Sequence, residues 1–257
     1  MEALEQSAIQ AFEGRTYRHL EQWFPHHCDL LGEEQMRRVV ALGWQKAKGY
    51  GLTAECCVRS YIDLMCLVGG GFDSDILLPW AIDILKDRSC DQVTRGDRLY
   101  DKTWDYVDHI AKDYRDASGR PTTNRFMDDL RQIRRHADTT ITPSGTPAFV
   151  ESQWLRLQRL FPAKCEYVSQ SLVRESIASG IGAANSYEIF TERGLILYTG
   201  MRFVLGGGFD GDPLLPWASA TLRDSAIADE GQKVDKLYAR GVSFLKRWWK
   251  LSSGQEI

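Results

Sequence analysis

The sequence lacks the short motifs by which many catalytic sites can be recognised. It contains no G-x-S-x-G, no G-x-x-x-x-G-K-[ST] and no H-E-x-x-H, so nothing indicates a nucleophile elbow, a P-loop or a zinc-protease helix. The five histidines show no triad spacing. We therefore predict no catalytic residue, no bound metal and no cofactor. An enzyme whose site is assembled only by the fold stays as an alternative.

Long apolar runs and a cysteine framework are also missing. No stretch approaches the roughly 18 apolar residues of a membrane span, and no basic segment precedes an apolar run at the N-terminus. Five of the six cysteines lie in the first half and none forms a C-x-x-C pair, which argues against a disulfide framework and a zinc site. We expect free thiols and a soluble protein in the cytoplasm.

The charge balance does not indicate a nucleic-acid binder. Of 257 residues, 32 are basic and 35 acidic, giving a formal net charge of -3, whereas nucleic-acid binders carry a basic excess on the binding face. The dense bases Arg131, Arg134 and Arg135 are typical of a solvated helix face. Trp248 and Trp249, flanked by bases, suit a membrane surface, but the apolar spacing back to Val234 favours a helix packed on the core.

One unusual phrase occurs twice. GGGFDSDILLPWA begins at Gly69 and GGGFDGDPLLPWA begins at Gly206, 137 positions later. The same offset relates further residues with no net insertion from Phe24 to Leu85, after which it becomes 138. The matched pairs include Phe24 and Phe161, Cys28 and Cys165, Gly43 and Gly180, Tyr50 and Tyr187, Tyr61 and Tyr198, Leu85 and Leu222, then Leu99 and Leu237. We infer an internal duplication.

Each unit is predicted to be helical. Leu99, Val107, Ile110 and Tyr114 recur at helical spacing. The segment from 192 to 207 could also be a strand, but its counterpart in the first unit has a helical pattern, so we predict helices for both. The fold class is all-α, with two tandem pseudo-symmetric helical repeats at 1–138 and 153–257. The stretch 139–152, rich in Thr, Ser, Pro and Gly, is predicted to be the linker.

The repeated phrase is interpreted as a structural device. The glycines end a helix, the phenylalanine anchors the loop, the aspartates bond backbone N–H groups, and the proline and tryptophan open the next helix, where we expect the tryptophans to be largely buried. Oxygen ligands two residues apart also suit a cation, but the further ligands of an EF-hand are missing. The motif residues are Gly69, Gly70, Gly71, Phe72, Asp73, Asp75, Pro79 and Trp80, with Gly206, Gly207, Gly208, Phe209, Asp210, Asp212, Pro216 and Trp217.

His26, His27 and Cys28 form the other group with metal-binding or catalytic potential. At the matching positions only the cysteine recurs, as Cys165. A cysteine kept in both units is more simply a small buried residue. We favour packing over chemistry here.

The chain resembles small helical proteins encoded among bacterial type VI secretion and polymorphic-toxin genes. The resemblance lies in the order of its motifs, which is FP, C, a helical G, YG, Y and then G-x-F-D-x-D-x-x-L-P-W-A. The likeness spans roughly residues 17–90 and 154–225. It implies an accessory role, in which an adaptor or chaperone holds an effector toxin or its PAAR-type tip protein before export. The resemblance brings no catalytic residue with it. His26, His27 and the cysteine-rich first unit depart from the pattern.

Three hypotheses from different classes follow. The first is the secretion adaptor, a protein that binds and does not turn over a substrate. The second is an immunity protein that blocks its toxin's active site, for which a net charge of -3 gives little support. The third is an enzyme with an unrecognised site.

Overall fold

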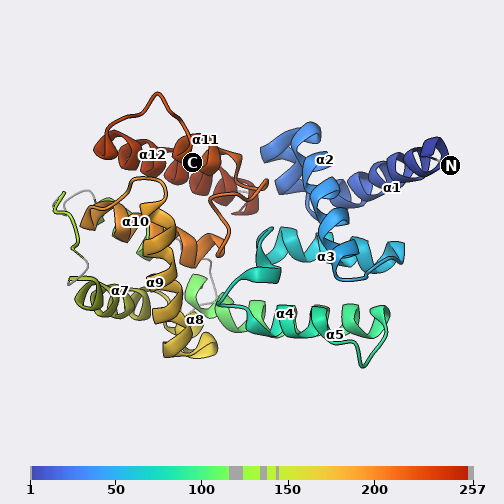
Figure 1. Cartoon of the computed structure of the whole chain (residues 1–257), viewed down its shortest axis with the longest axis horizontal. Helices are drawn as coiled ribbons and strands as arrows, with labels where there is room; N and C mark the ends of the chain where they lie inside the picture. Colours follow the sequence, from blue (N-terminus) through green and yellow to red (C-terminus); the bar gives the residue numbers. More distant parts are fainter. Residues whose placement is uncertain (1, 116–123, 134–137, 143–144, 254–257) are drawn as a thin grey trace.

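The computed structural model describes residues 2–115, 124–133, 138–142 and 145–253. These residues form twelve α-helices and two short 3-10 helices, and no β-strand occurs among them. The fold class is therefore all-α, as predicted. Figure 1 shows the helices before residue 115 on one side of the molecule and those after residue 145 on the other.

The first half is built from five α-helices. They are α1 (Glu2–Trp23), α2 (Pro25–Gly49), α3 (Glu55–Val68), α4 (Pro79–Lys86) and α5 (Gln92–Ile110), with 3-10 turns η1 (Phe72–Ser74) and η2 (Ala111–Tyr114). Helix α6 (Asn124–Ile133) follows them. The second half contains six α-helices: α7 (Thr146–Leu160), α8 (Pro162–Val168), α9 (Gln170–Asn185), α10 (Glu192–Leu205), α11 (Pro216–Leu222) and α12 (Glu230–Ser253).

The predicted linker is only partly irregular. Helix α7 begins at Thr146, with Pro147 in its first turn, where a missing N–H costs nothing. Thr140 forms an isolated antiparallel bridge with Thr191. Because residues 139–152 have the composition of a loop, the helix that begins within this stretch, at Thr146, was not predicted.

Helix α10 is the segment that could have been a strand. Nearly every side chain from Arg193 to Phe203 is buried. A helix surrounded by core on all sides needs apolar residues all round, so its sequence loses the helical periodicity. The helix prediction is confirmed.

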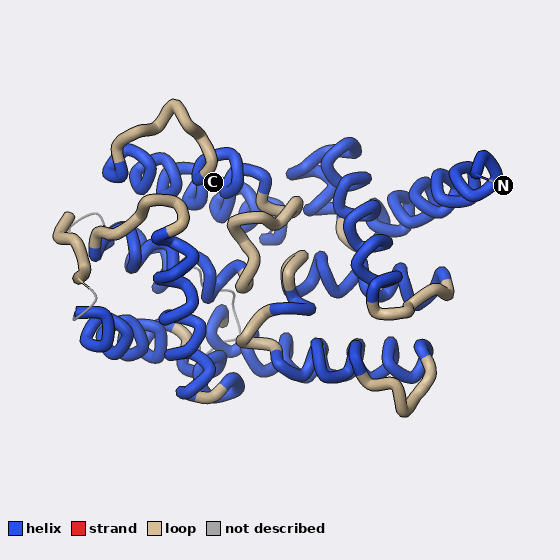
Figure 2. The backbone as a smooth tube through the Cα atoms, viewed as in Figure 1, coloured by secondary structure: helices blue, strands red, loops and turns tan. Residues whose placement is uncertain are grey.

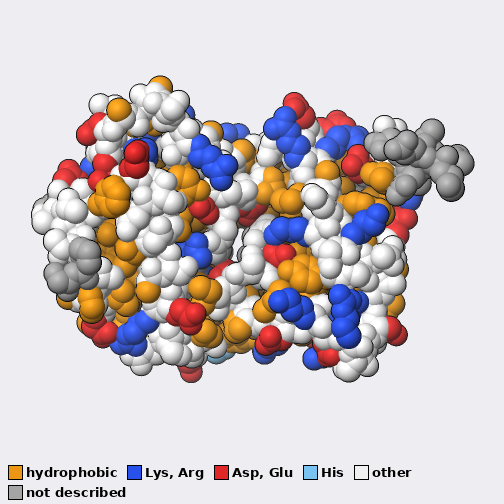
Figure 3. Space-filling view, viewed as in Figure 1, with side chains coloured by type: hydrophobic (Ala, Val, Ile, Leu, Met, Phe, Trp, Pro, Cys, Tyr) orange, Lys and Arg blue, Asp and Glu red, His pale blue; other side chains and the backbone are white. Residues whose placement is uncertain are grey.

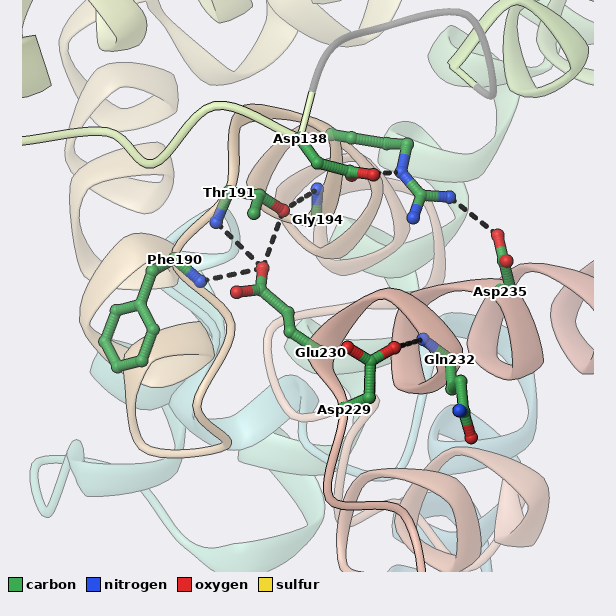
Figure 4. A network of polar contacts seen from close by, with 9 residues as sticks. Asp138, Phe190, Thr191, Gly194, Asp229, Glu230, Gln232 and Asp235 are labelled. Carbon is green, nitrogen blue, oxygen red and sulfur yellow. Dashed lines mark hydrogen bonds and ion pairs between the residues drawn. The ribbon is translucent and has the colours of Figure 1, made fainter.

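Residues at the repeat offset make the same local contacts. Gln92 at the start of α5 accepts hydrogen bonds from Thr53 N and Ala54 N (2.7 and 2.9 Å). At the start of α12, Glu230 accepts them from Phe190 N and Thr191 N (3.0 and 2.8 Å), as Figure 4 shows. A residue one turn further along the same helices, Arg95 or Lys233, donates to the carbonyl of Tyr50 or Tyr187 (2.8 and 2.7 Å).

The second half has an additional ionic contact around Glu230. The buried guanidinium of Arg193 bonds Asp138 and Asp235 (2.7 and 2.6 Å; Figure 4). Arg193 thereby joins the segment before α7 to α12.

Two positions at the repeat offset have a positive φ but different residues. Gly32 bends α2 with a φ of 76°, and Ser169, 137 positions later, separates α8 from α9 with a φ of 84°. This left-handed region is suited to glycine and strains other residues. The first half has the residue that the bend requires, and the second half does not.

Exchanging these residues is expected to move stability in opposite directions. Ser169→Gly should raise the free energy of unfolding by up to about 1 kcal/mol, because the relieved strain exceeds the entropic cost of glycine. Gly32→Ser should lower it by about 1–3 kcal/mol. Both sites are exposed, so packing changes little. Urea unfolding measures both variants, and a loss for Ser169→Gly would contradict the strain.

Candidate functional site

The two glycine-rich loops lie together where the halves meet. Each follows a helix, α3 or α10, that ends at a left-handed glycine, Gly69 (φ 100°) or Gly206 (φ 104°). We call residues 69–75 and 206–212 the paired loops. They contain twelve of the sixteen motif residues.

Reciprocal hydrogen bonds connect the paired loops. Gly70 N donates to Oδ2 of Asp212, and Gly207 N donates to Oδ2 of Asp75, each at 2.7 Å. The remaining oxygens accept from the residues that follow, Leu77 N at 2.9 Å and Leu214 N at 2.8 Å. Both carboxylates are buried. Each therefore closes its own turn and also binds the opposite loop by charge-assisted bonds, which are stronger than neutral ones.

The glycines allow the two backbones to approach. A Cβ on Gly70 would lie 2.5 Å from Oδ1 of Asp212, and one on Gly71 would lie 3.3 Å from the Cα of Gly208. A side chain at either position would displace the carboxylate or the opposite backbone.

Gly70→Ala is expected to lower the free energy of unfolding by about 1–3 kcal/mol, the cost of leaving a buried group without its partner. Gly211→Ala is the matched control, because a Cβ there meets nothing within 4 Å. It should change stability by no more than about 0.5 kcal/mol. Denaturant midpoints compare the two, and equal midpoints would refute the role assigned to the close approach.

The first aspartate of each loop is held from within its own half. Asp73 accepts from Lys46 Nζ at 2.8 Å and Tyr50 OH at 3.1 Å. Asp210 accepts from Tyr187 OH at 2.8 Å and Tyr198 OH at 2.9 Å. All four D-x-D carboxylates thus have protein donors. Within the described residues no group of three or more His, Cys, Asp or Glu side chains could hold a metal ion, so the cation interpretation gains no support.

Phe72 and Phe209 anchor the loops, as expected for buried aromatic rings. Their centroids lie 4.8 Å from Tyr61 and 5.1 Å from Tyr198. The sequence GGGFDG from Gly206 also matches the dinucleotide pattern G-x-G-x-x-G. That pattern requires a strand before it and a helix after it, whereas a helix precedes this loop.

Pro79 and Pro216 begin α4 and α11, and the tryptophans after them are less buried than predicted. Trp80 and Trp217 are half-buried against the core, beside Tyr106 (6.5 Å) and Phe244 (5.9 Å) respectively. They lie in the first turn of short helices that begin at an exposed proline.

Each half also places its last helix on the other half. Helix α5 packs against α8, and α12 packs against α2. At the first contact Asp113 accepts from Ala163 N and Lys164 N (2.9 and 2.8 Å), while the buried ammonium of Lys164 donates to the carbonyl of Phe203. At the second, His27 lies edge-on to Trp248 with centroids 4.5 Å apart.

His27 makes the second contact sensitive to pH. Burial lowers the pKa of His27 to about 4, although a hydrogen bond with the Cys66 backbone acts in the opposite direction. Since the pKa in the unfolded chain is about 6.5, the unfolded state binds the proton more readily. Stability from neutral His27 is complete above pH 6.5 and is lost as the pH falls towards 4.

The expected loss over this range is on the order of 3 kcal/mol. His27→Gln should remove that part of the pH dependence of unfolding. His26→Gln, a change at the neighbouring position, should leave it in place. If both variants show the same slope between pH 6.5 and 4, His27 is not the titrating group.

His26, His27 and Cys28 belong to no group of three or more His, Cys, Asp or Glu side chains that could hold a metal ion among the described residues. All six cysteines are free thiols. Burial raises the pKa of Cys28 to about 11, which disfavours a reactive thiolate. Of the predicted basic patch, Arg131 pairs with Asp128 (2.5 Å), and Arg134 and Arg135 lie outside the described residues.

The exposed face of α5 was not predicted from the sequence. Tyr100 and Trp104 are 52% and 41% exposed, and Val93 is 50% exposed. Their spacing of seven and four places them on one side of the helix. The sequence does carry a sign of this face, because Val93, Tyr100 and Trp104 form a second apolar stripe beside the core residues Leu99 and Val107.

No family model, no curated protein and no solved structure matches the chain. Among the described helices, none is both long and apolar enough to cross a membrane.

Proposed function

We propose that the protein is a non-enzymatic adaptor or chaperone that binds an effector toxin of a type VI secretion system, or its PAAR-type delivery protein, before export. The resemblance of the repeated phrase to accessory proteins of such loci names this partner. Binding without turnover is supported by how the chain uses its distinctive polar residues.

The observation that carries the proposal is the engagement of the four motif aspartates. Asp73, Asp75, Asp210 and Asp212 all accept hydrogen bonds from protein groups. A general acid, a general base or a metal ligand needs a carboxylate that can face a substrate. Here the repeated phrase serves to hold two halves together, which is the task of a scaffold.

We further propose that the halves are duplicated units, 1–138 and 153–257, related by an approximate two-fold axis between the paired loops. Reciprocal bonds from Asp75 and Asp212 are what such an axis would produce. Two joined units offer a broad surface, and Figure 3 shows a hollow between them on one face. A surface of this shape suits a folded partner.

Immunity is the second candidate, favoured by one specific observation. The exposed side of α5 carries Asp97, Asp101 and Asp108. Acidic residues beside exposed aromatic rings would fit the basic face of a toxin that acts on nucleic acid. An immunity protein would protect a cell by covering that face.

Co-expression with the toxin encoded nearby tests the proposal. For an adaptor we expect a co-purifying complex and a higher soluble yield of the effector, because binding shifts its folding equilibrium by mass action. The control is the toxin expressed alone. Relief of toxicity without any effect on export would instead support immunity. Failure of any complex to form would overturn both binding proposals.

A further inference from the structure

Helix α5 has a face that the rest of the chain leaves open. At about 100° per residue, Val93, Tyr100 and Trp104 form one line along the helix, and Asp97, Asp101 and Asp108 lie beside it. The opposite side, with Arg95, Leu99, Thr103 and Tyr106, is buried. We call the first six residues the α5 face.

The two rings on the α5 face are held as a pair. Tyr100 and Trp104 lie with centroids 6.0 Å apart in an edge-to-face arrangement. An amphipathic helix of a lone protein would place such residues in the core. Tyrosine and tryptophan are enriched at interfaces because they bury a large area with few rotatable bonds.

The basic residues of α5 are occupied within the chain, whereas the acids of the α5 face are not. Arg95 bonds backbone carbonyls, Arg98 pairs with Asp87 (2.6 Å), and Lys102 pairs with Asp105 (2.7 Å). Among the described residues, Asp97, Asp101 and Asp108 have no ion-pair partner. The face therefore presents aromatic rings flanked by three available negative charges.

The equivalent helix of the second half differs. Helix α12 exposes Lys236, Lys246, Arg247 and Lys250, and none of its described side chains is an exposed large hydrophobic group. A second copy of the chain could match the charges of the α5 face through α12. It would offer Tyr100 and Trp104 no exposed large apolar side chain among the described residues of α12.

We propose that the α5 face is the docking site for a cationic amphipathic segment of another protein, in which arginines alternate with apolar residues. This inference rests on the proposed binding function and names its surface. Arginine fits both parts of the face, because a guanidinium stacks on aromatic rings and binds carboxylates with two hydrogen bonds. The apolar residues of the segment cover the open ring edges and Val93.

The probe is an 18-residue helical peptide of arginine, leucine and alanine, compared with a peptide in which glutamate replaces arginine. The full-length protein is labelled with ¹⁵N, and Trp104→Phe identifies the indole N–H resonance of Trp104. We expect the arginine peptide to shift this resonance in a saturable way, with affinity falling as salt is added. The glutamate peptide should not shift it.

Matched variants separate the α5 face from general surface effects. Titration calorimetry gives the affinity of each variant, because Trp104→Ala removes the reporting resonance. Trp104→Ala should weaken binding of the arginine peptide at least about tenfold, whereas Trp23→Ala, at a side chain 65% exposed on α1, should not. The double variant Asp97→Asn/Asp101→Asn should weaken binding of the arginine peptide about threefold or more. Asp29→Asn/Glu175→Gln removes the same charge elsewhere and should leave affinity within about twofold. Circular dichroism checks that each variant is folded.

The outcomes distinguish this inference from the proposed function. Equal binding by the Trp104→Ala and Trp23→Ala variants, or a concentration-dependent dimer that Trp104→Ala abolishes, would overturn the α5 face as a site for another protein. If an effector complex forms and survives Trp104→Ala, the adaptor stands and the docking site is elsewhere. If no effector complex forms but the peptide binds as expected, the partner is wrong and the α5 face stands.

Discussion

The structure depends on two buried hydrogen bonds that exchange carboxylates between loops. Asp75 and Asp212 each bond a backbone N–H of the opposite loop and one of their own. A buried carboxylate without donors is costly, so neither half can satisfy its motif aspartate fully when alone. The glycines at 70 and 207 are required for the same reason, since a Cβ would occupy the carboxylate's place. This mutual dependence accounts for the presence of the motif in both halves.

Binding between the loops also fixes the outer surface. With the halves joined at their centre, α5 lies against α8 and α12 against α2, and the long helices are held from two sides. Tyr100 and Trp104 are therefore displayed on a helix whose other side is buried. A rigid display lowers the entropic cost of binding a partner. In this arrangement the repeated phrase supports the proposed binding surface without forming part of it.

The sequence predicts the helices and the role of the repeated phrase, but not which groups that phrase would bind. Helix α10 follows from its counterpart, and a turn-forming role for Asp75 and Asp212 follows from their place in the loop. Their second bond, to a glycine more than 130 positions away, has no local signal. The same holds for the exposure of Trp104: spacing shows that it leaves the core stripe, and only the fold shows that no other helix covers it. The start of α7 at Thr146 was missed because its first residues are also turn formers.

Residues at the repeat offset keep the same hydrogen-bond acceptor and differ in the donor. The carbonyl of Tyr50 accepts a hydrogen bond from Arg95, and the carbonyl of Tyr187 accepts one from Lys233. The same exchange occurs where the halves overlap: Lys164 bonds the Phe203 carbonyl, and His27, at the matching position, bonds the Cys66 backbone. A backbone carbonyl persists through any substitution, so the fold tolerates a new donor of similar reach. The two positions therefore differ chemically, because Lys164 supplies an Nζ donor, whereas burial lowers the pKa of His27 and favours its neutral form. The contact between the halves at His27 thus responds to acid.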